Sequence, residues 1–350
     1  MRREFGMGVA LLAMCLGLFI SNPDFLGQSN FINLIRQISM LGIYAIGIGF
    51  VIVAGGIDLS IGSVIGLTGV LIAKVSSPAA GGLAHSLWIG IPLAIAVALA
   101  IGWLQGLLIT RLKLQPFIVT LGFMLLIRGV SQTIVEGGTL SLSGSKLLAM
   151  ANGGLWMYHG DPLLPYPFLI FLGVIALGTY VLHFTVFGRY VFALGGNRDA
   201  AEYSGINVRL VESATYLISA GLAGVAGVCY AAYISQMSQQ VGISYELFAI
   251  AAAVLGGCSL RGGEGTVLGV VIGSAVMKVI DNGIIMFQLR YVDADGINRI
   301  GRLNQNWTNI IIGGVILVAV ILDQVVHIVQ QKRRIRRAAA ASEAAAAPAH

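Results

Sequence analysis

The sequence predicts an all-α protein that crosses a membrane many times. Of its 350 residues, 57% are hydrophobic and only 10% are charged, whereas charged residues make up about 25% of an ordinary soluble domain. Apolar runs long enough, or nearly long enough, to cross a bilayer follow one another along the chain. The 47 glycines are spread through these runs, where glycine lets helices approach closely in lipid. This composition excludes disulfide-rich secreted scaffolds, disordered chains and soluble enzymes.

The apolar runs predict about ten spans. The first, 5–20, follows two arginines as a signal peptide does, but no A-x-A cleavage pattern follows it, so we expect an uncleaved span. The others are 31–54, 61–75, 87–109, 117–135, 163–186, 211–234, 247–260, 266–286 and 307–328. Two of them, 61–75 and 247–260, are short for a complete crossing, which needs about 20 residues. We expect residues 1–330 to form one membrane domain and 331–350 to be a disordered tail.

The placement of Lys and Arg predicts the orientation. With the N-terminus inside, ten crossings place thirteen of these residues on the inner side and four on the outer side. The inner residues are Arg2, Arg3, Arg111, Lys113, Arg189, Arg198, Arg209, Arg261 and the five of the run 332–337, and the outer residues are Lys146, Arg290, Arg299 and Arg302. The positive-inside rule predicts this asymmetry. We therefore expect both termini in the cytoplasm.

A glycine break separates the second apolar run from the third. Gly55 and Gly56 end one helix, and Asp58 or Ser60 can cap the next. Asp58 is then either a helix cap or part of a gate or pathway beside the membrane. A second glycine break, 256–263, lies on the same side of the membrane and suggests two related halves.

Other polar residues lie inside the predicted spans. Arg128 is about a dozen residues into its span and is expected to face protein or water. A hydroxylated solute could pass uncharged polar or aromatic groups, although each of them can equally serve helix packing. These groups are Gln37, Tyr44, Gln105, Gln132, Tyr230, Tyr233 and Gln236.

The inner loop 187–210 contains a short helix with its own boundaries. Asn197 can cap its N-terminus and Gly205 suits a left-handed stop. A helix over about 198–204 is too short to be stable alone. The small side chains of Ala200 and Ala201 would let a groove of another protein cover this helix closely. Around that face, Arg198, Asp199 and Glu202 would form a rim for polar contacts. The alternative is an ordinary interfacial loop helix.

The sequence contains no pattern for catalysis or nucleotide binding. Its five histidines are scattered, and no two have the spacing of a metal pair. No lysine is preceded by Gly and followed by Ser or Thr, as a phosphate-binding loop requires. We therefore expect no metal or cofactor in this chain, and any ATP-driven work must be done by another chain.

Four segments carry a resemblance to a known family. Residues 55–75, 117–132, 187–208 and 245–269 resemble, in the same order, the membrane permease subunits of bacterial ABC importers for monosaccharides, the ribose, galactose and xylose branch. The resemblance implies a ten-helix permease in the inner membrane, paired with a second permease that is either a copy of itself or a related chain. It also implies an ATPase with two nucleotide-binding domains, which binds ATP and Mg²⁺, and a periplasmic sugar-binding protein. The short helix at 197–205 matches the coupling-helix position of that family.

One residue departs from the family pattern. Members commonly read Y-E-L-D-A-I-A-A where this chain has Phe248 in place of the acid. The gate or binding-protein contact that the acid makes in the family is therefore in question at this position, and Phe248 is a pathway candidate.

The permease has two alternatives, an ion-coupled transporter and a membrane-embedded enzyme. An ion-coupled sugar transporter is expected to need a carboxylate inside the membrane, and the candidates here, Asp58 and Asp281, lie near span ends. A membrane-embedded enzyme would need a clustered acid, base or metal set, which the sequence does not show.

Overall fold

The computed structural model describes residues 2–76, 86–142, 146–147, 150, 153–158, 161–286, 288–292 and 298–302, with scattered helical positions between 307 and 324. Its helices are α1 (Arg2–Ser21), α2 (Gln28–Val53), α3 (Ile61–Ser76), α4 (Leu87–Arg111), α5 (Pro116–Val135), α7 (Tyr166–Thr179), α8 (Val186–Gly196), α9 (Arg198–Tyr203), α10 (Val208–Ile234), α11 (Tyr245–Leu255) and α12 (Val267–Met286). A 3-10 turn (Pro23–Leu26) joins α1 to α2, and a π-helical turn (Tyr180–Phe184) continues α7.

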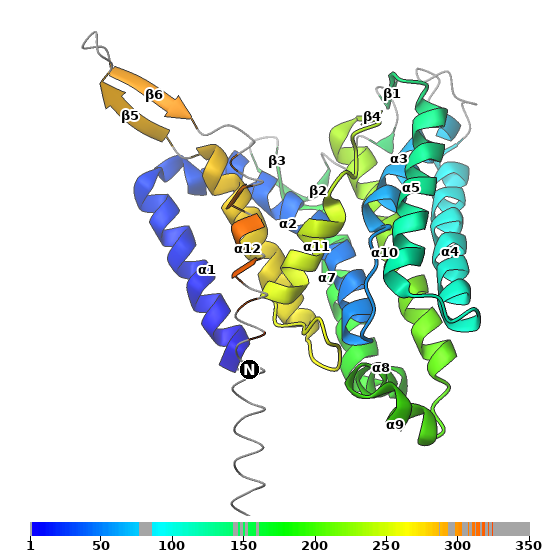
Figure 1. Ribbon diagram of the computed structural model, residues 1–350. Coiled ribbons are helices and arrows are strands. Elements are labelled where there is room, and N and C mark those ends of the chain that lie inside the picture. Colours follow the sequence, from blue (N-terminus) through cyan, green and yellow to red (C-terminus); the bar gives the residue numbers. More distant parts are fainter. Residues whose placement is uncertain are drawn as a thin grey trace, which may run out of the picture.

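Short strands accompany the helices in the described part of the chain. They are β1 (Thr139–Ser141), β2 (Gly154–Tyr158), β3 (Asp161–Pro165), β4 (Gln236–Ser238), β5 (Gln288–Val292) and β6 (Asn298–Arg302), paired antiparallel as β1–β4, β2–β3 and β5–β6. Figure 1 shows the long helices side by side, with the strands toward one end and α8 and α9 at the other. We call these the strand end and the α9 end.

The all-α membrane fold predicted from the sequence is confirmed. Seven of the described helices are long and apolar enough to cross a membrane, and α3 and α11 are shorter apolar helices. Nine of the ten predicted runs correspond to these helices, and the tenth, 307–328, lies mostly outside the described residues. The run 247–260 was predicted too long, because α11 ends at Leu255 and the residues after it form the glycine break.

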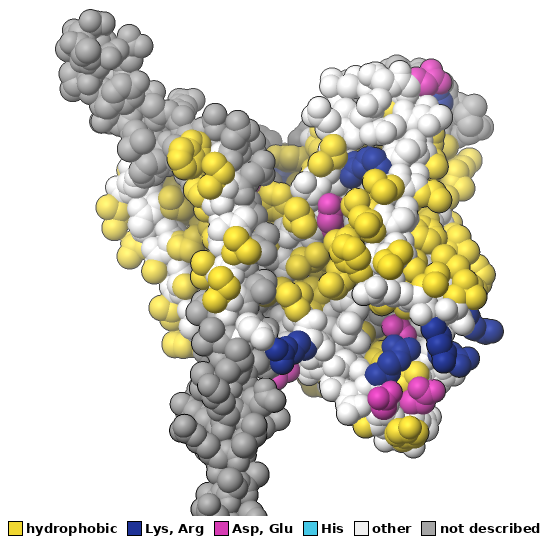
Figure 2. Space-filling model, viewed as in Figure 1, with side chains coloured by type: hydrophobic (Ala, Val, Ile, Leu, Met, Phe, Trp, Pro, Cys, Tyr) yellow, Lys and Arg dark blue, Asp and Glu magenta, His cyan; other side chains and the backbone are white. Residues whose placement is uncertain are grey.

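Burial separates central helices from peripheral ones. In the most apolar stretch of α2, 78% of the residues are buried within the protein, whereas none are buried in that of α1. α10 packs along α2, α3 and α4. Apolar side chains cover much of the visible face, while charged side chains gather mainly around α9 (Figure 2).

Glycine allows α4 to lie against the backbone of α10. A Cβ atom on Gly106 would lie 2.8 Å from the Cα of Ser213, and one on Gly102 would lie 2.7 Å from the carbonyl oxygen of Tyr216. Any larger residue would force the two helices apart. These two glycines therefore have the packing role expected of glycine in lipid.

The two short spans are half-crossings that start from the same place. After α2 reaches the α9 end, residues 56–60 turn back into the bundle, and α3 then runs toward the strand end, where Gly69 contacts Met237 of β4. α11 runs from the strand side toward the α9 end (Figure 1). The first turns of α3 and α11 touch, since Gly62 lies against the carbonyl oxygen of Gly242 and the carboxylate of Glu246.

Candidate functional site

The short helix predicted in the inner loop is present as α9. The side-chain oxygen of Asn197 accepts a hydrogen bond from the backbone N–H of Ala200 at 2.9 Å, which caps the helix. Gly205 has a φ of +81°, so the left-handed stop predicted there is confirmed. The loop also contains α8, a separate helix that the sequence analysis did not predict.

The exposed face of α9 differs in one respect from the predicted face. Ala200 is exposed, but Ala201 is 4% exposed and packs into this chain's own core. Ala201 was therefore wrongly placed on the partner-facing side. Tyr203, which the sequence analysis missed, is 91% exposed, and its spacing of three residues from Ala200 would have placed it on the same helical face.

The charged rim of α9 divides into two parts. The guanidinium of Arg198 donates a hydrogen bond to the carboxylate of Glu212 on α10 at 2.7 Å, and this bond raises the pKa of Arg198. Arg198 thus ties α9 to the bundle. Asp199 and Glu202 remain exposed. Both line a groove of about 650 Å³ that continues to the turn between α4 and α5, where Lys113 lies.

Three glycine-rich segments meet beside this groove. The backbone N–H of Gly263 donates a hydrogen bond to the carbonyl oxygen of Val53 at 2.8 Å. A Cβ atom on Gly262 would lie 2.8 Å from the carbonyl oxygen of Gly195 and 2.9 Å from the Cα of Gly55. We call this contact the glycine junction. It brings the end of α8, which leads into α9, against both of the glycine breaks that the sequence singled out.

Asp58 and Ser60 belong to a buried polar network. One carboxylate oxygen of Asp58 accepts from the backbone N–H and the hydroxyl of Ser60 at 2.9 and 2.7 Å. The other accepts from the hydroxyl of Ser219 on α10 at 2.7 Å, and the Gln105 side chain donates to the Ser60 hydroxyl at 2.7 Å. All four residues are 0% exposed. Asp58 thus fixes the turn that leads into α3, in which Ser60 occupies the cap position, while its role as a gate stays a prediction.

Arg128 faces protein, as predicted. Its guanidinium on α5 donates to the carbonyl oxygens of Val241 and Gly242 at 2.8 and 2.9 Å. Arg128 therefore holds the turn that leads into α11. Gln132, one helical turn further along α5, is exposed and does not line the cavity described below.

Glu246 is a buried carboxylate that the sequence analysis did not single out. It lies in the first turn of α11, is 8% exposed, and one of its carboxylate oxygens has no hydrogen-bond partner among the described residues. The signal that could have identified it is an acidic residue at the start of an apolar run.

The contacts of Arg128 give a first testable prediction. Arg128→Met is expected to lower the free energy of unfolding by about 1.5–3 kcal/mol, the value of a hydrogen bond to a charged group. Arg128→Lys should recover part of this loss, because the ammonium keeps the charge but cannot form the two-pronged contact. Thermal unfolding of the detergent-purified protein measures both. An Arg128→Met protein that unfolds at the wild-type temperature would show that the two hydrogen bonds of Arg128 do not hold the turn.

A cavity of about 650 Å³ lies among α2, α10, α11 and α12, near the strand end. Its aromatic lining is closely arranged: the rings of Tyr44 and Tyr245 stack with centroids 6.2 Å apart and planes at 12°, and the centroid of Tyr230 is 5.0 Å from that of Tyr245. We call this space the tyrosine cavity. It is lined by Gln37, Met40, Tyr44, Tyr230, Tyr233, Ile234, Gln240, Ile243, Ser244, Tyr245, Phe248, Lys278 and Asp281.

Phe248 stands in the wall of this cavity beside an ion pair. The ammonium of Lys278 lies 3.0 Å from one carboxylate oxygen of Asp281 and 5.4 Å from the centroid of the Phe248 ring. Four of the polar or aromatic residues that the sequence named for solute passage line the same cavity: Gln37, Tyr44, Tyr230 and Tyr233. The structure thus gathers Phe248 with them, in a cavity that neither Asp58 nor Arg128 lines.

Comparison with known proteins identifies the family. A family described as the permease component of branched-chain amino acid transport systems matches residues 30–320. The ribose import permease of Haemophilus influenzae is 34% identical over 79% of this chain and 83% of its own length. That of Bacillus subtilis is 33% identical over 92% and 93%, and the galactose/methyl galactoside import permease of Escherichia coli K12 is 33% identical over 92% and 94%. No solved structure matches the chain. Since the match covers most of the chain and its curated relatives are import permeases, this protein belongs to that family of membrane permease components.

Proposed function

We propose that this chain is the membrane permease subunit of an ATP-driven importer that carries a monosaccharide across the bacterial cytoplasmic membrane. The observation that carries the proposal is the similarity to ribose and galactose import permeases, which extends over as much as 92% of the chain. The permease does not itself transform the sugar. It alternates between outward and inward openings around it.

A separate ATPase subunit drives the cycle and binds ATP and Mg²⁺. The exposed face of α9, with Ala200 and Tyr203, enters a groove on that subunit, and Asp199 and Glu202 make polar contacts at the rim. Docking supplies the stability that a six-residue helix lacks alone.

The glycine junction carries the movement of α9 into the bundle. α9 follows α8 directly, and the end of α8 touches the break before α3 and the break after α11. Residues of the junction such as Gly55 and Gly262 have φ values of +86° and +85°, which favour glycine. Displacing α9 therefore shifts both half-crossing helices together.

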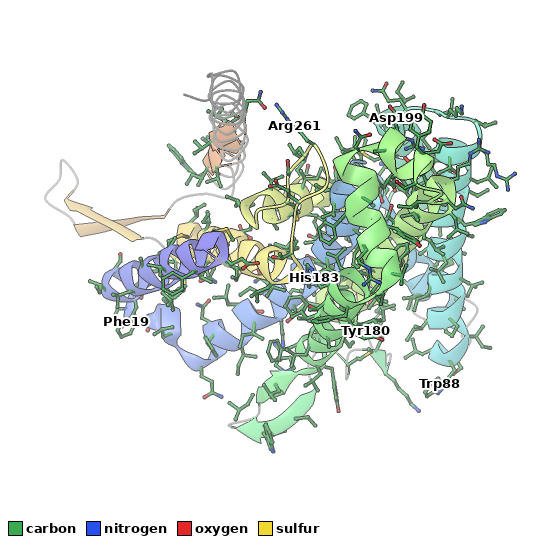
Figure 3. The ribbon with its side chains drawn as sticks, turned by 90° about the horizontal axis from the view of Figure 1, so that it is seen from below. Phe19, Trp88, Tyr180, His183, Asp199 and Arg261 are labelled. Atoms are coloured by element: carbon green, nitrogen blue, oxygen red, sulfur yellow. The ribbon has the colours of Figure 1, made fainter. Side chains whose placement is uncertain are left out.

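The α9 end faces the cytoplasm, and the strand end faces the periplasm. Basic residues of the predicted inner loops gather near the α9 end, where Arg111, Lys113, Arg198, Arg209 and Arg261 line two adjacent grooves. Figure 3, in which the molecule is seen from the α9 end, shows Arg261 and Asp199 on the same side of the view. A periplasmic sugar-binding protein then delivers its ligand at the strand end, and a second permease, identical or related, completes the importer.

The number of buried carboxylates does not distinguish an ion-coupled transporter from an ABC permease. Besides Asp58 and Asp281, the described bundle buries Glu212 and Glu246, at 7% and 8% exposure. The sequence argument named only Asp58 and Asp281, so Glu212 and Glu246 add two buried carboxylates to its candidates. Family membership supports the permease, because the curated relatives include an inner membrane ABC transporter permease that matches 89% of this chain.

An ATPase assay in detergent tests the division of labour. The purified permease with its ATPase subunit should hydrolyse ATP faster when a sugar-loaded binding protein is added, and the permease alone should hydrolyse none. Hydrolysis by the ATPase that is the same with and without the permease would contradict the proposal.

A further inference from the structure

We propose that the tyrosine cavity is a binding site for a monosaccharide inside the permease, with Asp281 as the acceptor of a sugar hydroxyl. This inference rests on the proposed function and deepens it, because it says where in the chain the solute is held. The cavity is set by the four helices α2, α10, α11 and α12.

The size and position of the cavity suit a small solute. Its volume of about 650 Å³ falls within the roughly 300–1,000 Å³ of small-molecule sites. Its lining includes Gln240, Ile243 and Ser244, in the segment between β4 and α11, so it lies on the strand side of the bundle. In the proposed orientation this is the side from which the solute arrives.

The aromatic lining matches the shape of a sugar ring. A pyranose or furanose has faces of C–H groups and an edge of hydroxyls. The partly exposed ring of Tyr245, backed by the buried rings of Tyr44 and Tyr230, offers a rigid apolar surface, and tyrosine adds a hydroxyl that donates or accepts. Gln37 and Gln240 add amides to the same wall. The lining therefore combines apolar faces with hydrogen-bonding groups, as recognition of a polyhydroxylated ring requires.

Asp281 provides the observation that points to a ligand. It is 7% exposed and lines the cavity. Lys278 binds one of its carboxylate oxygens at 3.0 Å, whereas the other has no hydrogen-bond partner among the described residues. Leaving such an oxygen unpaired is costly. This oxygen is itself buried, so the carboxylate turns when a sugar hydroxyl donates to it, and the charge-assisted bond removes that cost.

Phe248 shapes what the site accepts. Its ring lies beside the Lys278 ammonium, 5.4 Å away, and leaves that cation to pair with Asp281. A solute that carries its own carboxylate or phosphate would compete with Asp281 for Lys278 and meet an apolar ring on the other side. The cavity is thus suited to a neutral sugar.

Solute protection of an introduced cysteine tests the site directly. Ile243 lines the cavity and is 51% exposed. In a Cys15→Ser background, Ile243→Cys should react with a membrane-impermeant maleimide added from the periplasmic side. D-ribose or D-galactose at about ten times its dissociation constant should slow this reaction roughly tenfold, because only the empty fraction reacts.

The matched control for protection is Leu26→Cys. Leu26 is 50% exposed, in the turn between α1 and α2, and does not line the cavity. Its labelling should be unaffected by either sugar. Protection of Ile243→Cys by neither sugar would overturn the site. Because labelling needs no ATPase, protection without ATP-driven uptake would keep the site and contradict the proposed function instead.

Uptake by two further variants tests the assigned groups. Asp281→Asn should reduce uptake of the protecting sugar roughly 10- to 100-fold, the effect of losing a hydrogen bond to a charged group. Tyr245→Phe removes one hydroxyl from the lining and should raise the KM for uptake. The control is Tyr180→Phe, the same change at a side chain that is 61% exposed on the outside of the bundle (Figure 3). Should Asp281→Asn fail to fold, Tyr245→Phe remains decisive, and a wild-type KM for it would overturn the assignment.

Discussion

Ala200→Arg is expected to abolish sugar uptake and to prevent the ATPase subunit from co-purifying with the permease. Ala200 is exposed on α9, so arginine there does not disturb the permease's own packing. In a close-packed groove of the ATPase, however, the long charged side chain has no room, and truncating or obstructing an interface centre typically costs 2 kcal/mol or more, about 30-fold or more in affinity. Uptake in cells and affinity purification from membranes measure the two effects.

Two controls separate docking from folding. Ala200→Ser keeps the side chain small and should retain both uptake and co-purification. Ala201→Arg, by contrast, should lower the thermal stability of the permease itself, because Ala201 is buried in its own core. If Ala200→Arg transports as well as the wild type, α9 is an ordinary loop helix and the coupling role is wrong.

Asp58→Ala is expected to destabilise the permease by about 3 kcal/mol or more and to abolish uptake. An N-cap alone is worth about 1 kcal/mol. Here the carboxylate also accepts from Ser60 and Ser219 hydroxyls in a fully buried site, and removing it leaves these donors unsatisfied, each at a cost of about 1–3 kcal/mol. Thermal unfolding and uptake are measured on the same preparation.

Asp58→Asn distinguishes the cap from the gate. Asparagine keeps one accepting oxygen for Ser60, and the Ser219 hydroxyl can rotate to accept from the new amide. We therefore expect near wild-type stability and substantial uptake. A folded Asp58→Asn protein that assembles with its ATPase but does not transport would give the negative charge a role of its own in the pathway.

Local patterns in the sequence predicted the helices and their ends because those features depend on nearby residues. Long apolar runs predicted the spans. The capping side chain of Asn197 and the left-handed backbone conformation of Gly205 predicted where α9 begins and ends. The ion pair of Lys278 and Asp281, at 3.0 Å, depends on the same kind of local spacing, since the two residues are three positions apart on α12.

Contacts between distant segments could not be read in the same way. Nothing near Ala201 in the sequence shows that the core covers it, and nothing near Gly55 shows that Gly195 and Gly262 lie against it. The tyrosine cavity likewise joins residues about 240 positions apart, from Gln37 to Asp281. Single residues were therefore named as solute contacts, while the cavity that gathers some of them required the fold.

Transport in proteoliposomes tests the central claim most directly. The permease, its ATPase subunit and the sugar-binding protein are reconstituted, and accumulation of radiolabelled D-ribose and D-galactose is followed with and without ATP on the side of the α9 end. The account predicts that one or both sugars accumulate only when ATP, the ATPase and the binding protein are all present, and that ionophores which collapse ion gradients have no effect. Accumulation by the permease alone, following an ion gradient and abolished by ionophores, would contradict it.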